Sequence, residues 1–235
     1  INKSNIMGFY RGPNIVTDGL VLALDAGSGR SYDGTTAWND LSSTKSVYTL
    51  NNGVTYQSIN GGVFDFDGVD DYASTSSAPI SAGSTAYSME AVFKTNTTSA
   101  IQSVWEQGTT VQTTGTRACM ILLSNGTGGF NGQSADFHAV SYSANIWYHW
   151  LITIDTSLST NKCKIYINGV LSAQGNPNNS STLNIGADGA RVGNKFSNST
   201  ENFDGNIALA RAYNKALTQA EVTQNYNAQK SRFGL

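Results

Sequence analysis

Short runs of alternating apolar residues, separated by Gly, Asn and Asp, recur along the whole chain and limit what it can fold into. Side chains alternate between the two faces of a strand, so this pattern predicts antiparallel strands in an all-β sandwich or barrel. The clearest runs lie at residues 20–25, 62–67, 87–95, 118–123, 135–142, 148–155, 163–168 and 206–213. Asn168 and Gly169 also predict a hairpin, because a type I′ turn needs two positive φ angles.

One helix is predicted near the C-terminus. Thr218 and, three residues later, Glu221 form a capping box, which places the start of the helix near Gln219. Residues four apart lie on the same helix face, so Val222 and Tyr226 are expected on its buried face. The other polar residues of the helix are expected to point mostly to water: Gln224, Asn225 and Asn227.

The charge content of the chain narrows the classes of partner. Only 13% of the residues are charged, the net charge is −2, and the lysines and arginines are scattered. Nucleic-acid binding needs a basic stripe that neutralises phosphates, so nucleic acid is not an expected partner. No run of about 18 apolar residues is present, so membrane insertion is not expected either. A surface rich in neutral Ser, Thr, Asn and Gly suits an extracellular or virion protein.

The length of 235 residues suits one domain, because all-β sandwiches commonly reach this size. Residues 1–14 show no clean alternation and end near Gly12-Pro13, so they are expected to form an N-terminal arm, with the sandwich over residues 15–235. The chain begins with Ile, and its first methionine is Met7. Residues 1–6 are therefore expected to come from an upstream start or from a longer precursor.

Both cysteines, Cys119 and Cys163, lie in apolar runs that look like strands. Cys163 shares strand parity with Ile165 and Ile167, which places its thiol inward. We expect two buried free thiols. The alternative is one disulfide between two strands, which needs an oxidising compartment and neighbouring Cα atoms.

Five segments, in this order, resemble a known family. They are GLVLALDA at 19–26, FDFDGVDDY at 64–72, WYHWLITID at 147–155, IYINGVL at 165–171 and FDGNIA at 203–208. On these segments the chain resembles the laminin-G-like branch of the concanavalin A-like lectin/glucanase superfamily. The resemblance implies a jelly-roll sandwich of two curved antiparallel sheets, to which the predicted short C-terminal helix is added.

The two ends of the chain, GFYRGPNIV at 8–16 and NYNAQKSRFGL at 225–235, resemble the termini of laminin-G-like proteins of tailed phages, especially marine ones. The likeness implies a non-enzymatic recognition or assembly module on the virion surface, in the capsid, neck, tail or fibre. Its expected partner is a neighbouring virion protein or a host-surface glycan, and a homo-oligomer is compatible with either role. The alternative is a bacterial secreted or cell-surface carbohydrate-binding module, and a more remote one is a glycan-cleaving enzyme.

The catalytic motif of the related glucanases is missing from the sequence. The resemblance implies Glu-x-Asp-x-(x)-Glu on one strand, which holds two carboxyl groups about 5–5.5 Å apart on one face. The glutamates lie more than ten residues apart in the chain: Glu90, Glu106, Glu201 and Glu221. Asp65 and Asp67 share a strand face and are the one other pair considered. No catalytic residue is predicted.

Calcium is the ion best suited to this chain, and no other cofactor is expected. It takes six to eight oxygen ligands, and laminin-G-like domains, which the chain resembles, often bind it near a sheet edge. Four carboxylates lie within seven residues: Asp65, Asp67, Asp70 and Asp71. The alternative is that these aspartates form turns around Gly68. Asp188 falls where the related pentraxins place calcium ligands, but as a single carboxylate it is also explained as an ordinary turn residue.

Glycan binding by aromatic faces would use exposed Trp side chains, and the sequence offers two candidates. Trp38 lies in a loop-like stretch, and Trp105 lies beside Glu106 and Gln107, so both are expected at the surface. Burial in the core is the alternative for each of them.

Overall fold

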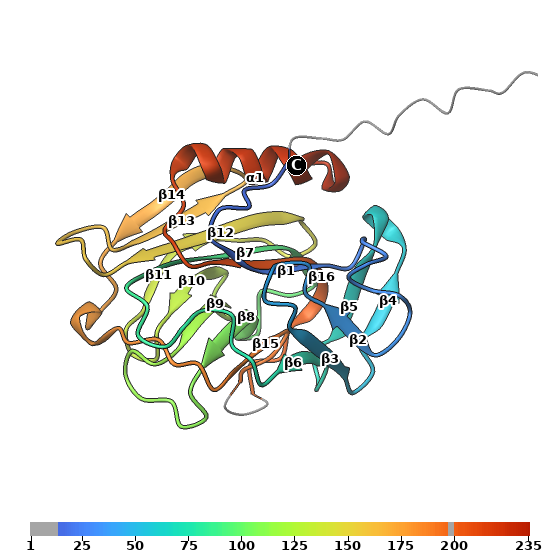
Figure 1. Ribbon diagram of the computed structural model, residues 1–235, viewed down its shortest axis with the longest axis horizontal. Coiled ribbons are helices and arrows are strands. Elements are labelled where there is room, and N and C mark those ends of the chain that lie inside the picture. Colours follow the sequence, from blue (N-terminus) through green and yellow to red (C-terminus); the bar gives the residue numbers. More distant parts are fainter. Residues whose placement is uncertain (1–13, 197–199) are drawn as a thin grey trace, which may run out of the picture.

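Two antiparallel sheets of eight strands each lie face to face in the computed structural model, which describes residues 14–196 and 200–235 (Figure 1). We call one the helix-side sheet; it contains β1 (Leu20–Asp25), β4 (Thr55–Gln57), β5 (Val63–Asp67), β7 (Ala86–Thr95), β12 (Tyr148–Asp155), β13 (Cys163–Ile167), β14 (Val170–Gly175) and β16 (Asp204–Tyr213). We call the other the open sheet; it contains β2 (Ala37–Asn39), β3 (Val47–Asn51), β6 (Tyr72–Thr75), β8 (Gln102–Gly108), β9 (Ala118–Leu122), β10 (Thr127–Asn131), β11 (Phe137–Ser141) and β15 (Gly189–Val192). The predicted all-β jelly-roll sandwich is confirmed, and each of the eight predicted runs contains a strand.

The apolar core lies between the sheets. The helix-side sheet has the strand order β14-β13-β12-β7-β16-β5-β4 with β1 on β16, and the open sheet has the order β11-β10-β9-β8-β15-β6-β3-β2. Inward side chains of both sheets form one large cluster. At its centre Phe93 packs edge to face on Trp150 and Phe203, with ring centroids 5.5 and 6.0 Å away. Burial of these rings stabilises the contact between the sheets.

Helix α1 (Gln219–Phe233) lies across the outer face of the helix-side sheet (Figure 1). The Thr218 hydroxyl accepts from the backbone N–H of Glu221, and the Glu221 carboxylate accepts from the backbone N–H of Thr218. The predicted capping box is therefore confirmed. Val222 is fully buried, in one apolar cluster with Leu217 and Tyr166, as the spacing predicts. Tyr226 is only half-buried, because the buried face of the helix runs through Val222, Asn225, Gln229 and Phe233.

A buried polar network fastens the same helix to the sheet. Glu90 on β7 accepts hydrogen bonds from Arg211 (2.8 Å), from Nε2 of His149 (2.9 Å) and from Asn225 of the helix (2.7 Å). The prediction that Asn225 points to water is therefore wrong, because this amide is needed by a buried carboxylate and also accepts from the backbone N–H of Val16. Burial opposes ionisation of Glu90, but Arg211 and His149 outweigh it and hold the Glu90 pKa below its ordinary value.

Two further local predictions are confirmed. Asn168 and Gly169 have φ angles of 51° and 80°, as a type I′ turn between β13 and β14 requires. Cys119 and Cys163 are both free and fully buried. Cys163 lies in the apolar core, whereas Cys119 lies on β9 of the other sheet.

The predicted N-terminal arm, residues 1–14, lies outside the described residues except for Asn14. The Asn14 carbonyl accepts a hydrogen bond from Gln224 of the helix at 2.8 Å, so the described chain begins against α1. Among the described residues, no helix is both long enough and apolar enough to cross a bilayer.

Candidate functional site

A row of polar side chains crosses the outer face of the open sheet, across its strands. The antiparallel register places these residues directly opposite one another in the order Thr49, Ser74, Arg191, Glu106, Cys119, Asn131. Their sequence neighbours on the same strands, such as Trp105 and Met120, face the core. Strand alternation therefore gives this sheet an apolar inner face and a polar outer face.

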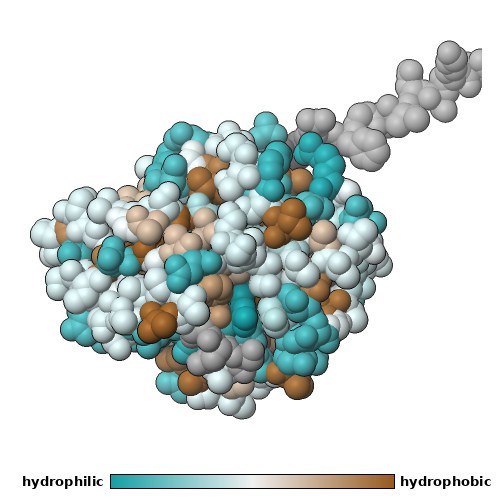
Figure 2. Space-filling model, turned by 60° about the horizontal axis from the view of Figure 1, so that its bottom comes forward, coloured by the Kyte–Doolittle hydropathy of each residue, from teal (hydrophilic) through white to brown (hydrophobic). Residues whose placement is uncertain are grey.

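A groove of about 420 Å³ lies over the β3-β6-β15 end of this row. Hydroxyl groups, one acidic residue, one basic residue and one aromatic ring line it: Val47, Thr49, Ser74, Thr75, Ser76, Asp188, Arg191 and Phe196. Its volume falls within the range of about 300–1,000 Å³ that is common for small-molecule sites. When the outer face of the open sheet is turned forward, pale and teal residues cover most of it and brown residues are scattered (Figure 2).

Arg191 projects from β15 into this groove. Its guanidinium lies 4.2 Å from the centre of the Tyr72 ring and 6.0 Å from that of Phe196. Nη1 donates to the side-chain oxygen of Asn194 (3.3 Å) and to the backbone carbonyl of Lys195 (3.0 Å), both of which are neutral acceptors. Within the described part of the chain, no carboxylate forms an ion pair with Arg191. The aromatic contacts therefore fix the position of a cation whose charge is not balanced by a neighbour.

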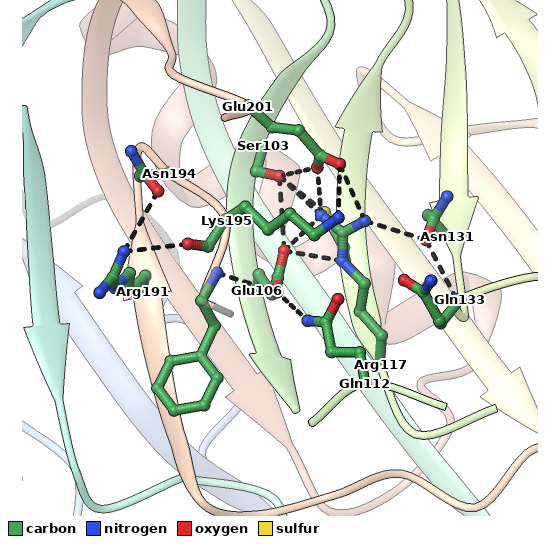
Figure 3. A network of polar contacts seen from close by, with 12 residues as sticks. Ser103, Glu106, Gln112, Arg117, Asn131, Gln133, Arg191, Asn194, Lys195 and Glu201 are labelled. Carbon is green, nitrogen blue, oxygen red and sulfur yellow. Dashed lines mark hydrogen bonds and ion pairs between the residues drawn. The ribbon is translucent and has the colours of Figure 1, made fainter. Parts of the chain in front are cut away.

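Next to the groove, a buried cluster of charged residues continues the polar row (Figure 3). Arg117 binds both Glu106 and Glu201 through Nη2, and its Nε donates to Glu106 at 2.7 Å. Ser103 donates to Glu201 at 2.7 Å, and Lys195 lies 3.3 Å from Glu201. The side chains of Glu106 and Arg117 are 0% and 2% exposed, so this is a desolvated ion cluster rather than a surface salt bridge.

The cluster also positions one wall of the groove. Glu106 Oε1 accepts from the backbone N–H of Phe196 at 3.0 Å and from Gln112 at 2.7 Å. Because Phe196 lines the groove, the Glu106 carboxylate links the buried cluster to the surface of the site. Glu201 belongs to the same cluster through Arg117 and Ser103.

The charges of the cluster stabilise one another. Burial opposes ionisation of Glu201, but hydrogen bonds and charge from Arg117 outweigh it and hold the Glu201 pKa below its ordinary value. Burial works against the charge of Arg117 as well, yet the neighbouring carboxylates raise its pKa. Burial raises the pKa of the Cys119 thiol well above its ordinary value, so this cysteine is present as a neutral thiol.

This geometry brings together two glutamates that lie 95 residues apart in the chain (201 − 106). Oxygens of Glu106 and Glu201 and the sulfur of Cys119 lie within 4.8 Å of one another. That separation is short enough for a glycosidase pair, but a general acid must keep its proton near neutral pH. Arg117 binds both carboxylates and lowers the pKa of Glu201, so Glu201 is poorly suited to act as a general acid.

Trp38 and Trp105 are not at the surface. Both are fully buried, Trp38 against Phe64 at a ring separation of 4.7 Å and Trp105 in the core cluster. The expectation of exposed rings fails because every residue of β8 is buried and because Trp38 points from β2 into the core. The aromatic groups of the groove are instead Phe196 and, beneath Arg191, Tyr72.

The predicted calcium ligands fall into three separate places. Oxygens of Asp67, Asp70 and Asp71 lie within 4.8 Å of one another at the end of β5. Asp65 is outside this group and accepts from Asn206 at 2.7 Å. Asp188 lies at the groove, where its carboxylate accepts from Thr110 at 2.8 Å, and among the described residues it belongs to no group of three or more possible metal ligands.

The three-aspartate group has features of both a turn and an ion site. Asp67 Oδ1 accepts from the backbone N–H groups of Val69 (2.8 Å) and Asp70 (3.2 Å), as in a turn. Asp71, however, is 4% exposed, and its Oδ1 has no hydrogen-bond partner. Burial and the neighbouring carboxylates raise the pKa of Asp71. A hard cation such as Ca²⁺ would satisfy that buried oxygen, so the residues present fit the predicted ion.

Sequence reasoning missed the groove and the ion cluster. Their residues come from strands and connections that lie far apart in the chain, and the strand order alone brings them together. A usable signal is present in each strand: Ser74, Arg191 and Cys119 alternate with small or apolar inward residues. Alternation identifies the outer face, but it does not give the order of the strands.

A family model described as the concanavalin A-like lectin/glucanases superfamily matches residues 67–223, about two thirds of the chain. The chain belongs to this family. A comparison with curated protein sequences finds no match. The family explains the sandwich, and the site must be argued from its own residues.

Solved structures of the same fold resemble the chain at low sequence identity. Domain 4 of AbnA, a GH43 extracellular arabinanase from Geobacillus stearothermophilus solved with arabinotriose, is 17% identical with a TM-score of 0.68, over 90% of this chain and all of that domain. Botulinum neurotoxin type C, whose cell entry depends on two ganglioside molecules, is 14% identical with a TM-score of 0.70, over 91% of this chain and 52% of that one. A Trypanosoma rangeli sialidase with sialic acid is 14% identical with a TM-score of 0.65, over 94% of this chain. This chain spans about a third of the length of the sialidases it matches (36% in that comparison), and likenesses at such identity show the fold alone.

Proposed function

We propose that this protein is a non-enzymatic carbohydrate-binding module that holds a saccharide in the groove on the outer face of its open sheet. The observation that carries the proposal is the groove itself, where Ser and Thr hydroxyls, Asp188 and Arg191 converge beside the ring of Phe196. Sugars present hydroxyl groups that donate and accept hydrogen bonds, together with apolar C–H faces. A few fixed polar groups beside an aromatic ring complement both.

The structural neighbours support a binding role. The AbnA domain was solved in complex with arabinotriose, and the neurotoxin interacts with gangliosides. Two chains of this fold therefore interact with glycans. The scattered apolar residues on this face also favour a small polar ligand over a protein partner, because protein interfaces usually have a contiguous apolar centre.

The non-enzymatic part of the proposal rests on the ion cluster. Arg117 pairs with both nearby glutamates, and Glu106 is inaccessible to a substrate. Asp65 and Asp67 do not form an isolated acid pair either, since Asp65 bonds Asn206 and Asp67 holds a turn. An enzyme would instead need a carboxyl group that faces the groove and retains a proton.

We place this module on the virion surface of a tailed phage, where it binds a host-surface glycan. This setting rests on the terminal segments 8–16 and 225–235, and residues 8–13 lie outside the described structure. The alternatives are attachment to a neighbouring virion protein and a bacterial secreted or cell-surface module. Mass spectrometry of purified virions tests the setting, because a chain absent from the particle has no role there.

A glycan array followed by titration calorimetry tests the binding proposal. The groove variants Ser74→Ala and Phe196→Ala are expected to weaken binding of a hit by about tenfold each, through the loss of one hydrogen bond or one apolar contact. Ser172→Ala on the exposed edge strand β14 is the matched control and should bind as the wild type does. Binding that is unaffected by both groove variants, or release of reducing sugar by the wild type, contradicts the proposal.

A further inference from the structure

Arg191 distinguishes this groove from one built for neutral sugars. Arg117, Arg211 and Arg232 each form an ion pair with a carboxylate, whereas none of the described residues supplies a carboxylate to the half-buried Arg191. Its Nε is buried and unbonded, and its Nη1 reaches neutral oxygens only. No carboxylate of the described residues therefore compensates the guanidinium charge beside the ligand space.

A neutral ligand covering this guanidinium would remove water from the charge and offer no counter-charge in return. That desolvation carries a free-energy cost, which an anionic group on the ligand offsets through a charge-assisted hydrogen bond. Arginine is suited to this task because its planar donors match carboxylate and sulfate oxygens. The stacking of Arg191 on Tyr72 holds the donors in place before the ligand arrives, so little side-chain entropy is lost on binding.

Asp188 does not cancel this charge. It is exposed, its carboxylate accepts from the backbone and hydroxyl of Thr110, and it forms no ion pair with Arg191. Nor does the buried cluster contribute a free anion, because Glu106 and Glu201 are both bound to Arg117. The groove therefore presents one half-buried cation and one exposed acceptor, which suits an anion flanked by hydroxyl groups.

We infer that the groove selects an acidic saccharide, one that carries a carboxylate or sulfate group bound by Arg191. This inference rests on the proposed carbohydrate-binding function and adds the ligand class to it. The anion pairs with the guanidinium, the ring hydroxyls donate to Asp188 and bond Thr49 and Ser74, and Phe196 contacts the sugar face.

Matched pairs of saccharides test the inference by titration calorimetry at low ionic strength. Trigalacturonate is compared with galactotriose, 3′-sialyllactose with lactose, and 3′-sulfolactose with lactose, so that the three arms separate uronate, sialic acid and sulfate. At least one acidic member should bind about ten- to a hundredfold more tightly than its neutral partner. The preference should shrink as salt is added.

The variant Arg191→Gln should reduce binding of the acidic sugar to the level of its neutral partner, and Arg191→Lys should keep part of the preference. Arg30→Gln, the same charge change at an exposed arginine outside the groove, is the matched control. Equal affinity for acidic and neutral members, or an acidic preference that survives in Arg191→Gln, overturns the inference while leaving carbohydrate binding intact. If the wild-type protein binds no saccharide, acidic or neutral, the proposed function fails as well. A thermal melt of each variant checks that the fold is retained.

Discussion

The outer faces of the two sheets carry the same chemistry under different covers. Each has a buried glutamate paired with an arginine at the centre of its sheet: Glu90 with Arg211 on one, Glu106 with Arg117 on the other. On the helix-side sheet, α1 closes over the pair and Asn225 completes it. On the open sheet the polar row extends beyond the pair through Arg191 into the groove, which Ser74 and Thr49 also line. The two pairs therefore share their residue types and differ in their cover: the helix encloses one, and the other lies beside the proposed saccharide groove.

The largest effect is expected where the cover is complete. Glu90→Gln leaves the charge of Arg211 buried without a counter-charge, which should lower the free energy of unfolding by about 3–5 kcal/mol. Urea denaturation measures this loss. The double variant Glu90→Gln, Arg211→Met should recover part of it, and saccharide binding should remain at the wild-type level in both. A loss below about 1 kcal/mol would mean that the Glu90–Arg211 pair contributes little to holding the helix on the sheet.

A somewhat smaller effect is expected on the open sheet. Arg117→Met leaves two carboxylates unpaired, but Glu201 is 13% exposed and can turn toward water, so a loss of about 3 kcal/mol is expected. Unlike the Glu90 variant, this one should also weaken saccharide binding. Arg117 holds the Glu106 carboxylate in place, and without it that carboxylate is no longer fixed where it accepts from the backbone N–H of Phe196. Unchanged binding in a folded Arg117→Met protein would mean that the ion cluster does not support the groove. Both buried ion pairs would then serve stability alone.

The calcium prediction concerns the edge of the sandwich rather than either face. Calcium at a hundred times its dissociation constant should stabilise the fold by about 2.7 kcal/mol, since it binds the folded state alone. Asp71→Asn should abolish this gain, because it removes charge at the oxygen that has no partner. Asp188→Asn, at the groove, is the control and should keep it. A melting temperature that is the same with calcium and with excess chelator would leave these aspartates as turn formers.

The smallest effect is expected at the first turn of helix α1, which covers the helix-side sheet. Thr218→Ala removes the side-chain cap of α1 and should cost about 1 kcal/mol. Thr218→Ser keeps the hydroxyl and should cost a few tenths of that. Amide hydrogen exchange should show faster opening of the first helical turn, with β7 and β16 unchanged. Equal exchange in the two variants would mean that packing of Val222, and not the cap, fixes the start of the helix.

The fold follows from local signals far more than the site does. Every long alternating run is a strand, and the hairpin and the capped helix are where their motifs place them. Strands of three residues, such as β2 and β4, carry too few positions for a period to be visible. Strand β10 was also hidden, because Gly128 and Gly129 have no side chains to alternate.

The errors about the site have one cause. The polar neighbours Glu106 and Gln107 suggest an exposed position for Trp105. A strand that is buried on both faces can also contain polar residues, however, when each of them has a partner, as Glu106 has in Arg117. Asn225 was expected in water for the same reason. A sequence shows which residues are polar, but the partner that allows burial lies on another strand or helix, and pairing across the sheet depends on strand order.

The two free thiols give each sheet its own reporter. Cys119 is buried under the ion cluster of the open sheet, and Cys163 lies in the core on the helix-side sheet. Since neither is accessible in the folded state, an alkylating reagent can modify each one only when its own sheet opens. Peptide mapping of a slow labelling reaction would therefore measure the opening rate of the two halves separately, in the unmodified protein. The two labelling rates would therefore show whether the open sheet, which carries the groove, opens more often than the helix-side sheet.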